Sequence, residues 1–149
     1  MTTLSEQNKA IALRFGKEAW GNVPGWDRVW EELVAEDFVW YFCGSPEPIR
    51  GSKACQEFYA GLYRGFPDIQ LLTVEHAIAE GDKVAFRTTI KGSHTGEFMG
   101  IPPTGKWVSA SDLNLFQISN HKIVAWWYEL NLLSVMQQMG VIPDVAKVA

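Results

Sequence analysis

The spacing of hydrophobic positions changes partway along the chain. Before Phe66, apolar residues mostly recur every three or four positions, as on one face of a helix, with one aromatic segment between them. After Pro67, apolar and polar residues alternate or run together, as in strands. The pattern predicts helices over Ser5–Trp20, over Asp27–Val34, from Gly51-Ser52 to just before Phe66, and over Leu132–Met139. It predicts strands over Phe38–Cys43, Ile69–Ala79, Lys83–His94, Lys106–Ser119 and Lys122–Leu130.

Residues typical of helix ends and turns support these boundaries. Ser5 is expected to cap the first helix, because its hydroxyl can accept from a free amide of the first turn. Gly140, with Pro143 just beyond it, is expected to end the last helix. Gly81-Asp82 and Asn120-His121 are expected to form tight turns between neighbouring strands, and Ser45-Pro46-Glu47-Pro48 is expected to be a loop.

Helices followed by a run of antiparallel strands indicate an α+β fold rather than alternating βαβ units. We see no repeat or linker, so residues 1–149 are expected to form a single domain. A long antiparallel sheet must hide one face, and the three N-terminal helices can cover it. If the sheet curves around these helices, the open end of the resulting cone becomes an internal apolar pocket.

Composition narrows the classes of partner and compartment. The net charge is −4 without a basic stripe, which argues against nucleic acid, and no apolar run is long enough to span a membrane. The N-terminal segment lacks the apolar core of a signal peptide. Cys43 and Cys55 are expected to be buried thiols in a reducing cytoplasm. No histidine pair has zinc-ligand spacing and no glycine-rich phosphate loop is present, so the expected chemistry needs no cofactor or metal.

Seven tryptophans are the unusual part of the composition. Rings of this size either fill a core or line an apolar cavity. We expect Trp40 and Trp126 to line the cavity, and Trp107 and Trp127 to lie on the outer face of the sheet. The remaining three, Trp20, Trp26 and Trp30, belong to the helical part of the chain, where they would serve core packing or form the floor of the pocket. We expect the tryptophan excess to reflect a pocket and an association face rather than a larger core.

The predicted strand from Lys106 carries the most informative polar residues. Asp112 and Asn114 share one face with Ala110 and Phe116, because side chains in a strand alternate between faces. On the concave face of the sheet the carboxyl group would be partly desolvated, which raises its pKa toward that of a useful general acid or base. The alternative is that Asp112 faces solvent or pairs with an arginine.

Two further groups are candidates for the site. In the last strand, Trp126 and Tyr128 share a face, and the Tyr128 hydroxyl needs a hydrogen-bond partner, which can be a ligand oxygen or a backbone carbonyl. His94 lies between Gly92 and Gly96, which allow the backbone to fold tightly and place the ring.

Longer motifs resemble a known family. The segment from Gly92 to Lys106 reads GSHTGEFMGIPPTGK, and DFVWYF precedes it, while HKIVAWW and a helix ending in QQMG follow. These motifs, which extend over nearly the whole chain, are similar to those of the SnoaL-like polyketide cyclase (ester cyclase) family. The resemblance implies the nuclear-transport-factor-2-like superfold, a cone-shaped α+β barrel. It also implies a homodimer formed through the outer face of the sheet.

The family resemblance implies a small apolar pocket and a carboxylate base at the end of the last strand. That base removes a proton next to a carbonyl group, and the enolate closes a ring by aldol attack. The family motif W-x-x-x-D places Asn131 at the aspartate position, where a neutral amide can bind an oxyanion but cannot act as a base. The family histidine after the tryptophan of the first strand corresponds to Tyr41.

Three functional interpretations follow. The first is acid–base catalysis such as aldol cyclisation on a small apolar, polyketide-like substrate. The second is epoxide opening of the limonene epoxide hydrolase kind, which needs an arginine such as Arg87 between carboxylates. The third is binding of an apolar small molecule without catalysis. The expected catalytic residues are Asp112, Asn131, His94 and Tyr128. The expected substrate-binding residues are Tyr41, Trp40, Asn114, Trp126, Phe116, Arg87, Phe58 and Leu130.

Overall fold

A computed structural model describes residues 1–144, so the last five residues of the predicted domain lie outside the described part. In the described chain two helices come first, a third lies between the second and third strands, and a fourth follows the last strand. The helices are α1 (Leu4–Glu18), α2 (Trp26–Leu33), α3 (Ser52–Gly65) and α4 (Leu132–Gln138). The strands are β1 (Val34–Phe42), β2 (Ile49–Arg50), β3 (Gln70–Glu80), β4 (Lys83–Ser93), β5 (Trp107–Ser119) and β6 (Lys122–Leu130).

The predicted helices and strands are confirmed, although β1 begins at Val34 rather than at the predicted Phe38. Two other features are corrected. Thr3, rather than Ser5, caps α1: its hydroxyl accepts from the Glu6 amide, and the Glu6 carboxylate accepts from the Thr3 amide. Ser5 instead accepts a hydrogen bond from the Gly81 amide at 3.0 Å, which ties α1 to the turn between β3 and β4. The second correction is β2, which directly follows the expected loop and pairs with β1. It was not predicted, because two residues are too few to show a period.

The strands form one mixed sheet in the order β2-β1-β6-β5-β4-β3. Neighbouring strands are antiparallel except β1 and β6, which run parallel and bring the first long strand beside the last one. In this pair Trp40 lies opposite Trp126, and Phe42 lies opposite Tyr128. The pairing therefore joins segments more than eighty residues apart in sequence at the middle of the sheet.

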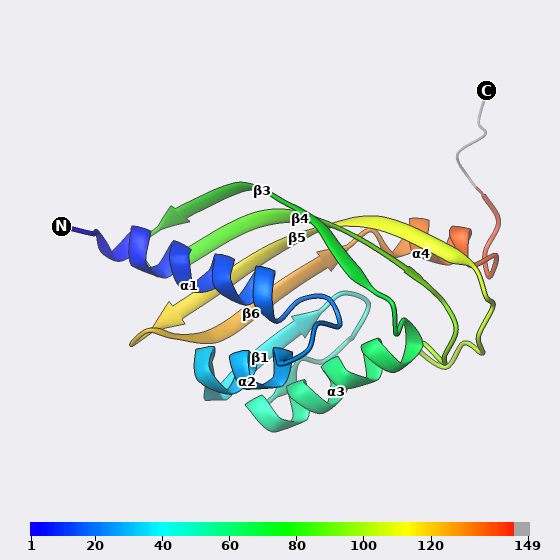
Figure 1. Ribbon diagram of the computed structural model, residues 1–149, viewed down its shortest axis with the longest axis horizontal. Coiled ribbons are helices and arrows are strands. Elements are labelled where there is room, and N and C mark those ends of the chain that lie inside the picture. Colours follow the sequence, from blue (N-terminus) through cyan, green and yellow to red (C-terminus); the bar gives the residue numbers. More distant parts are fainter. Residues whose placement is uncertain (145–149) are drawn as a thin grey trace.

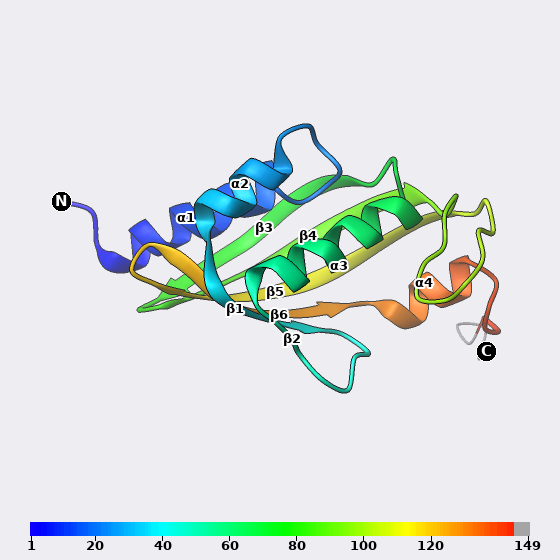
Figure 2. The same ribbon diagram turned by 90° about the horizontal axis from the view of Figure 1, so that it is seen from below.

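The sheet curves over the N-terminal helices, as Figures 1 and 2 show, and α4 lies near the opposite end of the molecule from the N-terminus. Burial follows the strand period: in β4 every second residue is buried, from Val84 to Gly92. The buried side of β4 and β5 faces the helices, and the other side is partly or fully exposed. This arrangement confirms the predicted α+β fold with helices on the concave side of a mainly antiparallel sheet.

Aromatic rings form the core under the sheet. Trp40 and Trp126 stack with their ring centroids 4.6 Å apart, and Tyr59 of α3 packs against both of them and against Trp30. These rings are fully buried, so a large core explains most of the tryptophan excess, which corrects the expectation that a pocket and an association face would explain it. As predicted, Trp107 and Trp127 lie on the outer side: Trp107 is 55% exposed, and Trp127 stacks on the partly exposed ring of Tyr41.

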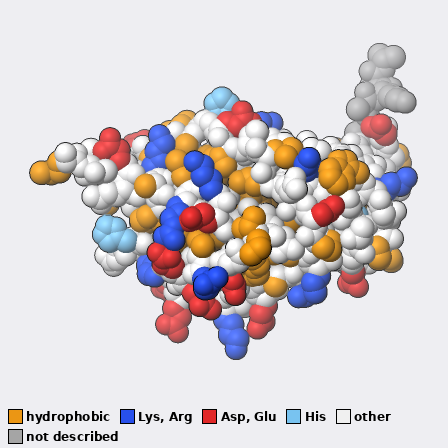
Figure 3. Space-filling view, in the orientation of Figure 1, with side chains coloured by type: hydrophobic (Ala, Val, Ile, Leu, Met, Phe, Trp, Pro, Cys, Tyr) orange, Lys and Arg blue, Asp and Glu red, His pale blue; other side chains and the backbone are white. Residues whose placement is uncertain are grey.

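The face of the molecule drawn in Figure 3 shows no patch of a single charge. On the side shown in Figure 3, acidic and basic side chains are interspersed among apolar ones. Cys43 and Cys55 are buried free thiols, as predicted from their number. Across residues 1–144, no helix has the length and apolar character needed to cross a bilayer.

Candidate active site

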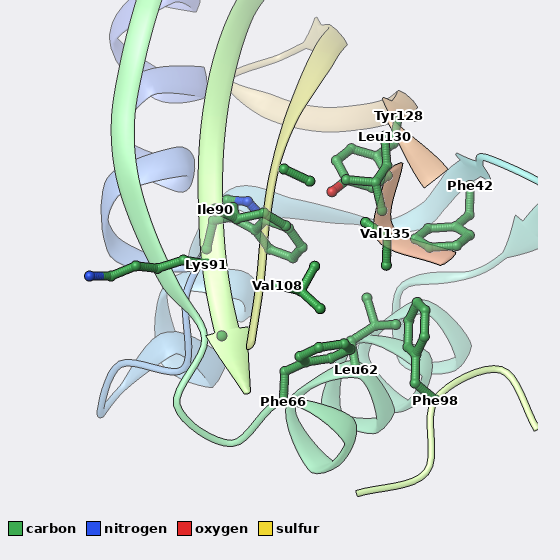
Figure 4. A pocket seen from close by; sticks show the side chains of 13 residues that line it. Phe42, Leu62, Phe66, Ile90, Lys91, Phe98, Val108, Tyr128, Leu130 and Val135 are labelled. Atoms are coloured by element: carbon green, nitrogen blue, oxygen red, sulfur yellow. The ribbon is translucent and has the colours of Figure 1, made fainter. Parts of the chain in front are cut away.

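An apolar cavity of about 40 Å³ lies between the sheet and the ends of α3 and α4 (Figure 4). Leu62, Phe66 and Phe98 form one side of it, and Val108 and Tyr128 lie across from them. The complete lining is Trp20, Phe42, Leu62, Phe66, Ile90, Lys91, Gly92, Phe98, Val108, Ala110, Tyr128, Leu130 and Val135. The Lys91 side chain extends away from the cavity, so Tyr128 and Trp20 are the other lining residues whose side chains carry a polar group.

The Tyr128 hydroxyl connects the cavity wall to a buried carboxyl group. It donates a hydrogen bond of 2.9 Å to Oδ2 of Asp112, which lies behind it and is 3% exposed. Burial raises the pKa of Tyr128 well above its usual range, and the neighbouring charge of Asp112 raises it further. Tyr128 therefore keeps its proton at physiological pH and offers its oxygen as an acceptor on the side away from Asp112.

Three donors converge on the Asp112 carboxyl group. Besides Tyr128, the Thr88 hydroxyl donates to Oδ1, and Nδ2 of Asn114 donates to Oδ1 at 2.8 Å. Asn114 in turn accepts from the indole nitrogen of Trp126 at 3.0 Å. Burial raises the pKa of Asp112, and its hydrogen bonds only partly offset this effect. The carboxyl group is thus held in a connected polar network inside an otherwise apolar core.

The register of three adjacent strands produces this network. Thr88 of β4 lies opposite Asp112 of β5, and Asn114 of β5 lies opposite Tyr128 of β6. All four side chains are on the concave face of the sheet and are buried. The predicted shared face of Asp112 and Asn114 is confirmed. Sequence analysis missed Thr88. Because side chains alternate along β4, Thr88 and its neighbour Arg87 lie on opposite faces of the sheet, and this pattern could have placed Thr88 on the inner face.

The raised pKa of Asp112 predicts a particular dependence of stability on pH. The folded state binds the carboxyl proton more tightly than the unfolded state, in which the pKa is about 3.9. Stability contributed by this proton is therefore present below about pH 3.9 and is lost as pH rises through the folded-state pKa. The free energy of unfolding of Asp112→Asn, measured by urea denaturation, should therefore increase relative to that of wild type as the pH is raised from 3.5 to 8.

Asp82→Asn provides a matched control of opposite sign. Asp82 is exposed, and its hydrogen bond with Lys83 lowers its pKa, so it contributes stability above the unfolded pKa that is lost as pH falls. The free energy of unfolding of Asp82→Asn should therefore decrease slightly relative to that of wild type as the pH is raised over the same range. A difference between Asp112→Asn and wild type that does not change with pH would contradict the predicted burial effect.

Several residues expected in the site lie elsewhere. Asn131 is exposed and caps α4, where its Oδ1 accepts from the Ser134 amide, so it confirms the capping role and does not line the cavity. Arg87 points to the outer face, where it pairs with Glu75 at 2.8 Å. Tyr41 is also on the outer face, stacked on Trp127. In each case the strand period or the strand end directs the side chain away from the interior.

The outward position of Arg87 removes the basis of the epoxide hydrolase interpretation. That chemistry requires an arginine between carboxylates inside the pocket. The strand that carries Arg87 presents Thr88 to Asp112 instead.

The remaining aromatic candidates belong to the core rather than to the cavity lining. Trp40, Trp126 and Phe116 are fully buried among other rings, and Phe58 packs against Trp40 and Phe42. Of the expected substrate-binding residues, Leu130 lines the cavity. The lining residues that sequence analysis missed come mainly from segments distant in sequence, such as Phe98 and Val135, and no local pattern distinguishes them.

His94 occupies a structural position beside the cavity. Its Nδ1 accepts from the Thr104 amide at 3.2 Å, so Nε2 carries the ring hydrogen, and its ring stacks on Phe66. The side chain is fully buried but does not line the cavity. It holds the segment from residue 94 to residue 105 together, consistent with the tight backbone predicted from its flanking glycines. Among residues 1–144 no group of three or more His, Cys, Asp or Glu side chains is arranged to hold a metal ion.

The chain is similar in sequence and fold to known proteins. The family model of the SnoaL-like polyketide cyclases matches residues 10–139. A proposed SnoaL-like polyketide cyclase from Jannaschia sp. CCS1 is 31% identical, with a TM-score of 0.88 over 96% of this chain and 98% of that one. AclR, a proposed hydroxylase from Streptomyces galilaeus, is also 31% identical, with a TM-score of 0.78 over 98% of this chain and 88% of that one. IdmH, a proposed polyketide cyclase from Streptomyces antibioticus, is 27% identical, with a TM-score of 0.71 over 89% and 98% of the two chains. No curated protein matches the chain.

Proposed function

Because the chain belongs to the SnoaL-like polyketide cyclase family, we propose that it catalyses proton abstraction next to a carbonyl group on a small apolar, polyketide-like substrate. Its fold is the cone-shaped α+β fold of the nuclear-transport-factor-2-like proteins. The observation that carries the proposal is the pair formed by Tyr128, at the wall of an apolar cavity, and the buried carboxyl group of Asp112 behind it.

The pair supports a proton relay. In its ionised form Asp112 accepts the hydrogen bond that the Tyr128 hydroxyl donates, which leaves a lone pair of the Tyr128 oxygen free to face a substrate. As that oxygen takes the proton from the carbon next to the carbonyl group, its own proton passes to Asp112. The products are an enolate, a neutral Asp112 and an unchanged Tyr128 hydroxyl, so protons and charge balance. The relay avoids a free tyrosinate, which the high pKa of Tyr128 disfavours.

The raised pKa of Asp112 suits both directions of this transfer. A carboxylate with an ordinary pKa is a weak base toward carbon acids, whereas burial makes Asp112 more basic. Once neutral, Asp112 can return its proton through Tyr128 to an oxygen that becomes an alkoxide in a later aldol step. In this proposal Asp112 takes the role that the family resemblance gives to the residue at position 131, where this chain has an asparagine.

The size of the cavity limits how a substrate enters. Ligand pockets for drug-sized molecules usually measure about 300–1,000 Å³, whereas this cavity measures about 40 Å³. A polyketide-like substrate therefore requires the walls to move apart, most simply at Phe98, which lies on an irregular segment between β4 and β5. The reactive end of the substrate would occupy the inner part beside Tyr128.

Isotope exchange tests the proposed chemistry without knowledge of the natural substrate. Acetophenone is a suitable probe because it is a small aromatic ketone with exchangeable hydrogens next to its carbonyl group. In D₂O we expect the protein to accelerate incorporation of deuterium into the methyl group above the rate in buffer, as followed by proton NMR. The rate should rise with pH through the raised pKa of Asp112, because only the ionised carboxylate can accept the relayed proton.

Binding without catalysis is the second candidate function. The observation that favours it is that Asp112 does not itself line the cavity and already has three hydrogen-bond donors. This alternative predicts saturable binding of acetophenone with no exchange above the rate in buffer. Exchange that saturates with probe concentration would exclude it.

A further inference from the structure

Trp20, one of the residues that line the cavity, carries a buried hydrogen-bond donor without a partner among the described residues. It lies just after α1, is 4% exposed and contributes to the lining. Its Nε1 has no hydrogen-bond partner among the described residues. A buried indole N–H usually finds an acceptor, so its position beside a cavity indicates that the acceptor comes with a ligand.

The polar groups around the indole are already engaged with other partners. The hydroxyls of Tyr59 and Tyr63, whose rings contact Trp20, both donate to the Ala19 carbonyl, at 2.6 and 2.8 Å. Tyr128 donates to Asp112, and the indole N–H of Trp126 donates to Asn114. No neighbouring ring therefore supplies Trp20 with an acceptor in the observed arrangement.

The backbone on both sides of Trp20 is fixed. Two hydroxyls hold the Ala19 carbonyl on one side. On the other side the Asn22 amide donates to the Ile69 carbonyl at 3.2 Å, and the Asn22 side chain donates to the Pro67 carbonyl at 2.8 Å. The indole is thus positioned before a ligand arrives, which reduces the entropy that binding must lose.

Two other buried nitrogen atoms also lack partners within residues 1–144, and neither belongs to the cavity lining. They are Nε1 of Trp40, in the aromatic core, and Nε2 of His94. Trp20 therefore differs from both in having its unpaired donor on a residue that a bound molecule can touch. Trp40 offers an internal comparison, because it carries the same unpaired group away from the cavity.

We infer that the Trp20 indole N–H donates a hydrogen bond to an oxygen acceptor of the ligand, which selects planar apolar molecules bearing a carbonyl or phenolic oxygen over pure hydrocarbons. The inference rests on the proposed function only in assigning the ligand to this cavity, and it requires no turnover. Tyr128 takes the proton next to the carbonyl group, whereas Trp20 donates a hydrogen bond to the oxygen of that group. Together the two residues orient a carbonyl compound in an otherwise apolar cavity.

A pair of matched probes tests this recognition. Acetophenone and α-methylstyrene have the same planar shape, but a CH₂ group replaces the carbonyl oxygen in the second. Dissociation constants measured by NMR titration should show that Trp20→Phe weakens acetophenone binding by about fivefold to tenfold, which is typical for loss of one neutral hydrogen bond. Binding of α-methylstyrene should change by less than about twofold, because it never made that bond.

Trp40→Phe is the matched control. It makes the same ring replacement and also removes an unpaired N–H, but it should alter the affinities for both probes equally. A site-specific replacement of Trp20 by 3-benzothienylalanine puts sulfur in place of the N–H and keeps the shape of the ring. This second variant should reproduce the selective loss, and it serves if Trp20→Phe fails to fold.

Each other outcome overturns the inference. Equal weakening of both probes by either Trp20 variant would make Trp20 a purely steric wall, and equal selective loss in Trp40→Phe would make the effect indirect. If wild type binds the probes normally and the Trp20 variants show no selectivity, only the inference fails. If wild type binds neither probe, the cavity is not a ligand site, and the proposed function fails together with it.

Discussion

Replacing Asp112 by asparagine is expected to slow exchange of the acetophenone methyl hydrogens by about 10²–10⁴-fold, the range over which a positioned general base contributes. The amide oxygen can still accept from Thr88, and the shape of the side chain is nearly unchanged, so the fold should persist. A neutral amide cannot take the relayed proton from Tyr128. Because Asp112 does not line the cavity, the dissociation constant for the probe should stay within about twofold, less than the loss of one hydrogen bond.

Two further variants separate a relay from independent contributions. Tyr128→Phe removes the group that touches the substrate and should lower the exchange rate about as much as Asp112→Asn. The double variant should be no slower than either single one, because residues that act as one unit lose their effect together. Asp82→Asn, the same chemical change at an exposed site, should retain the wild-type rate. Full exchange activity in Asp112→Asn would exclude the relay.

A methyl group at position 96 is expected to be among the most damaging small changes in the chain. A Cβ atom on Gly96 would lie 2.0 Å from the Arg64 carbonyl oxygen, which belongs to the helix backbone and cannot rotate away. The segment would have to lift from α3 and break the bonds that the Thr95 and Gly96 amides donate to the Gly65 carbonyl. Gly96→Ala should therefore cost about 3 kcal/mol, the upper part of the usual range for overpacking. In a chain of this size that corresponds to a fall in Tm of roughly 6–12 °C.

Gly61→Ala is the corresponding control on the same helix. Its added methyl group would meet only the flexible end of Arg64, at 3.4 Å, and alanine favours the helical backbone by about 0.5–1 kcal/mol over glycine. This variant should keep or raise Tm in a thermal melt. The Gly96→Ala variant should also show altered probe affinity, because the lifted segment carries Phe98. A Tm close to that of wild type would show that the backbone around residue 96 yields more easily than its contacts suggest.

The fold was largely predictable because its elements are long and strongly patterned. Strand β5 alternates over thirteen residues and α3 has a clear apolar face, so tertiary context did not override local preference. Strand β2 was missed because two residues carry no period. The parallel pairing of β1 with β6 was not predictable, since nothing in either strand alone names its partner.

The site was predictable only where it lies on a strand. Alternation along β5 places Asp112 on one face with Asn114, but the pattern left open whether that face is turned inward. Alternation along β4 places Arg87 on the opposite face from Thr88, although Arg87 was expected in the pocket. For Trp20 the sequence left core packing and the floor of the pocket open as alternatives, because its position depends on an irregular segment between two helices and on contacts with rings from α3 and β6. Positions set by tertiary packing leave no local signal in the sequence.

The pairing of the first long strand with the last one also fixes the order in which the protein can be completed. A chain emerging from the ribosome presents Phe38 and Trp40 early, but Trp126, which stacks on Trp40, is made more than eighty residues later. Contacts so distant in sequence make folding slow, and they leave apolar rings and an unpaired strand edge exposed in the meantime. We therefore expect synthesis that stops before β6 to leave an aggregation-prone chain, and the aromatic core to close only once the last strand has been released.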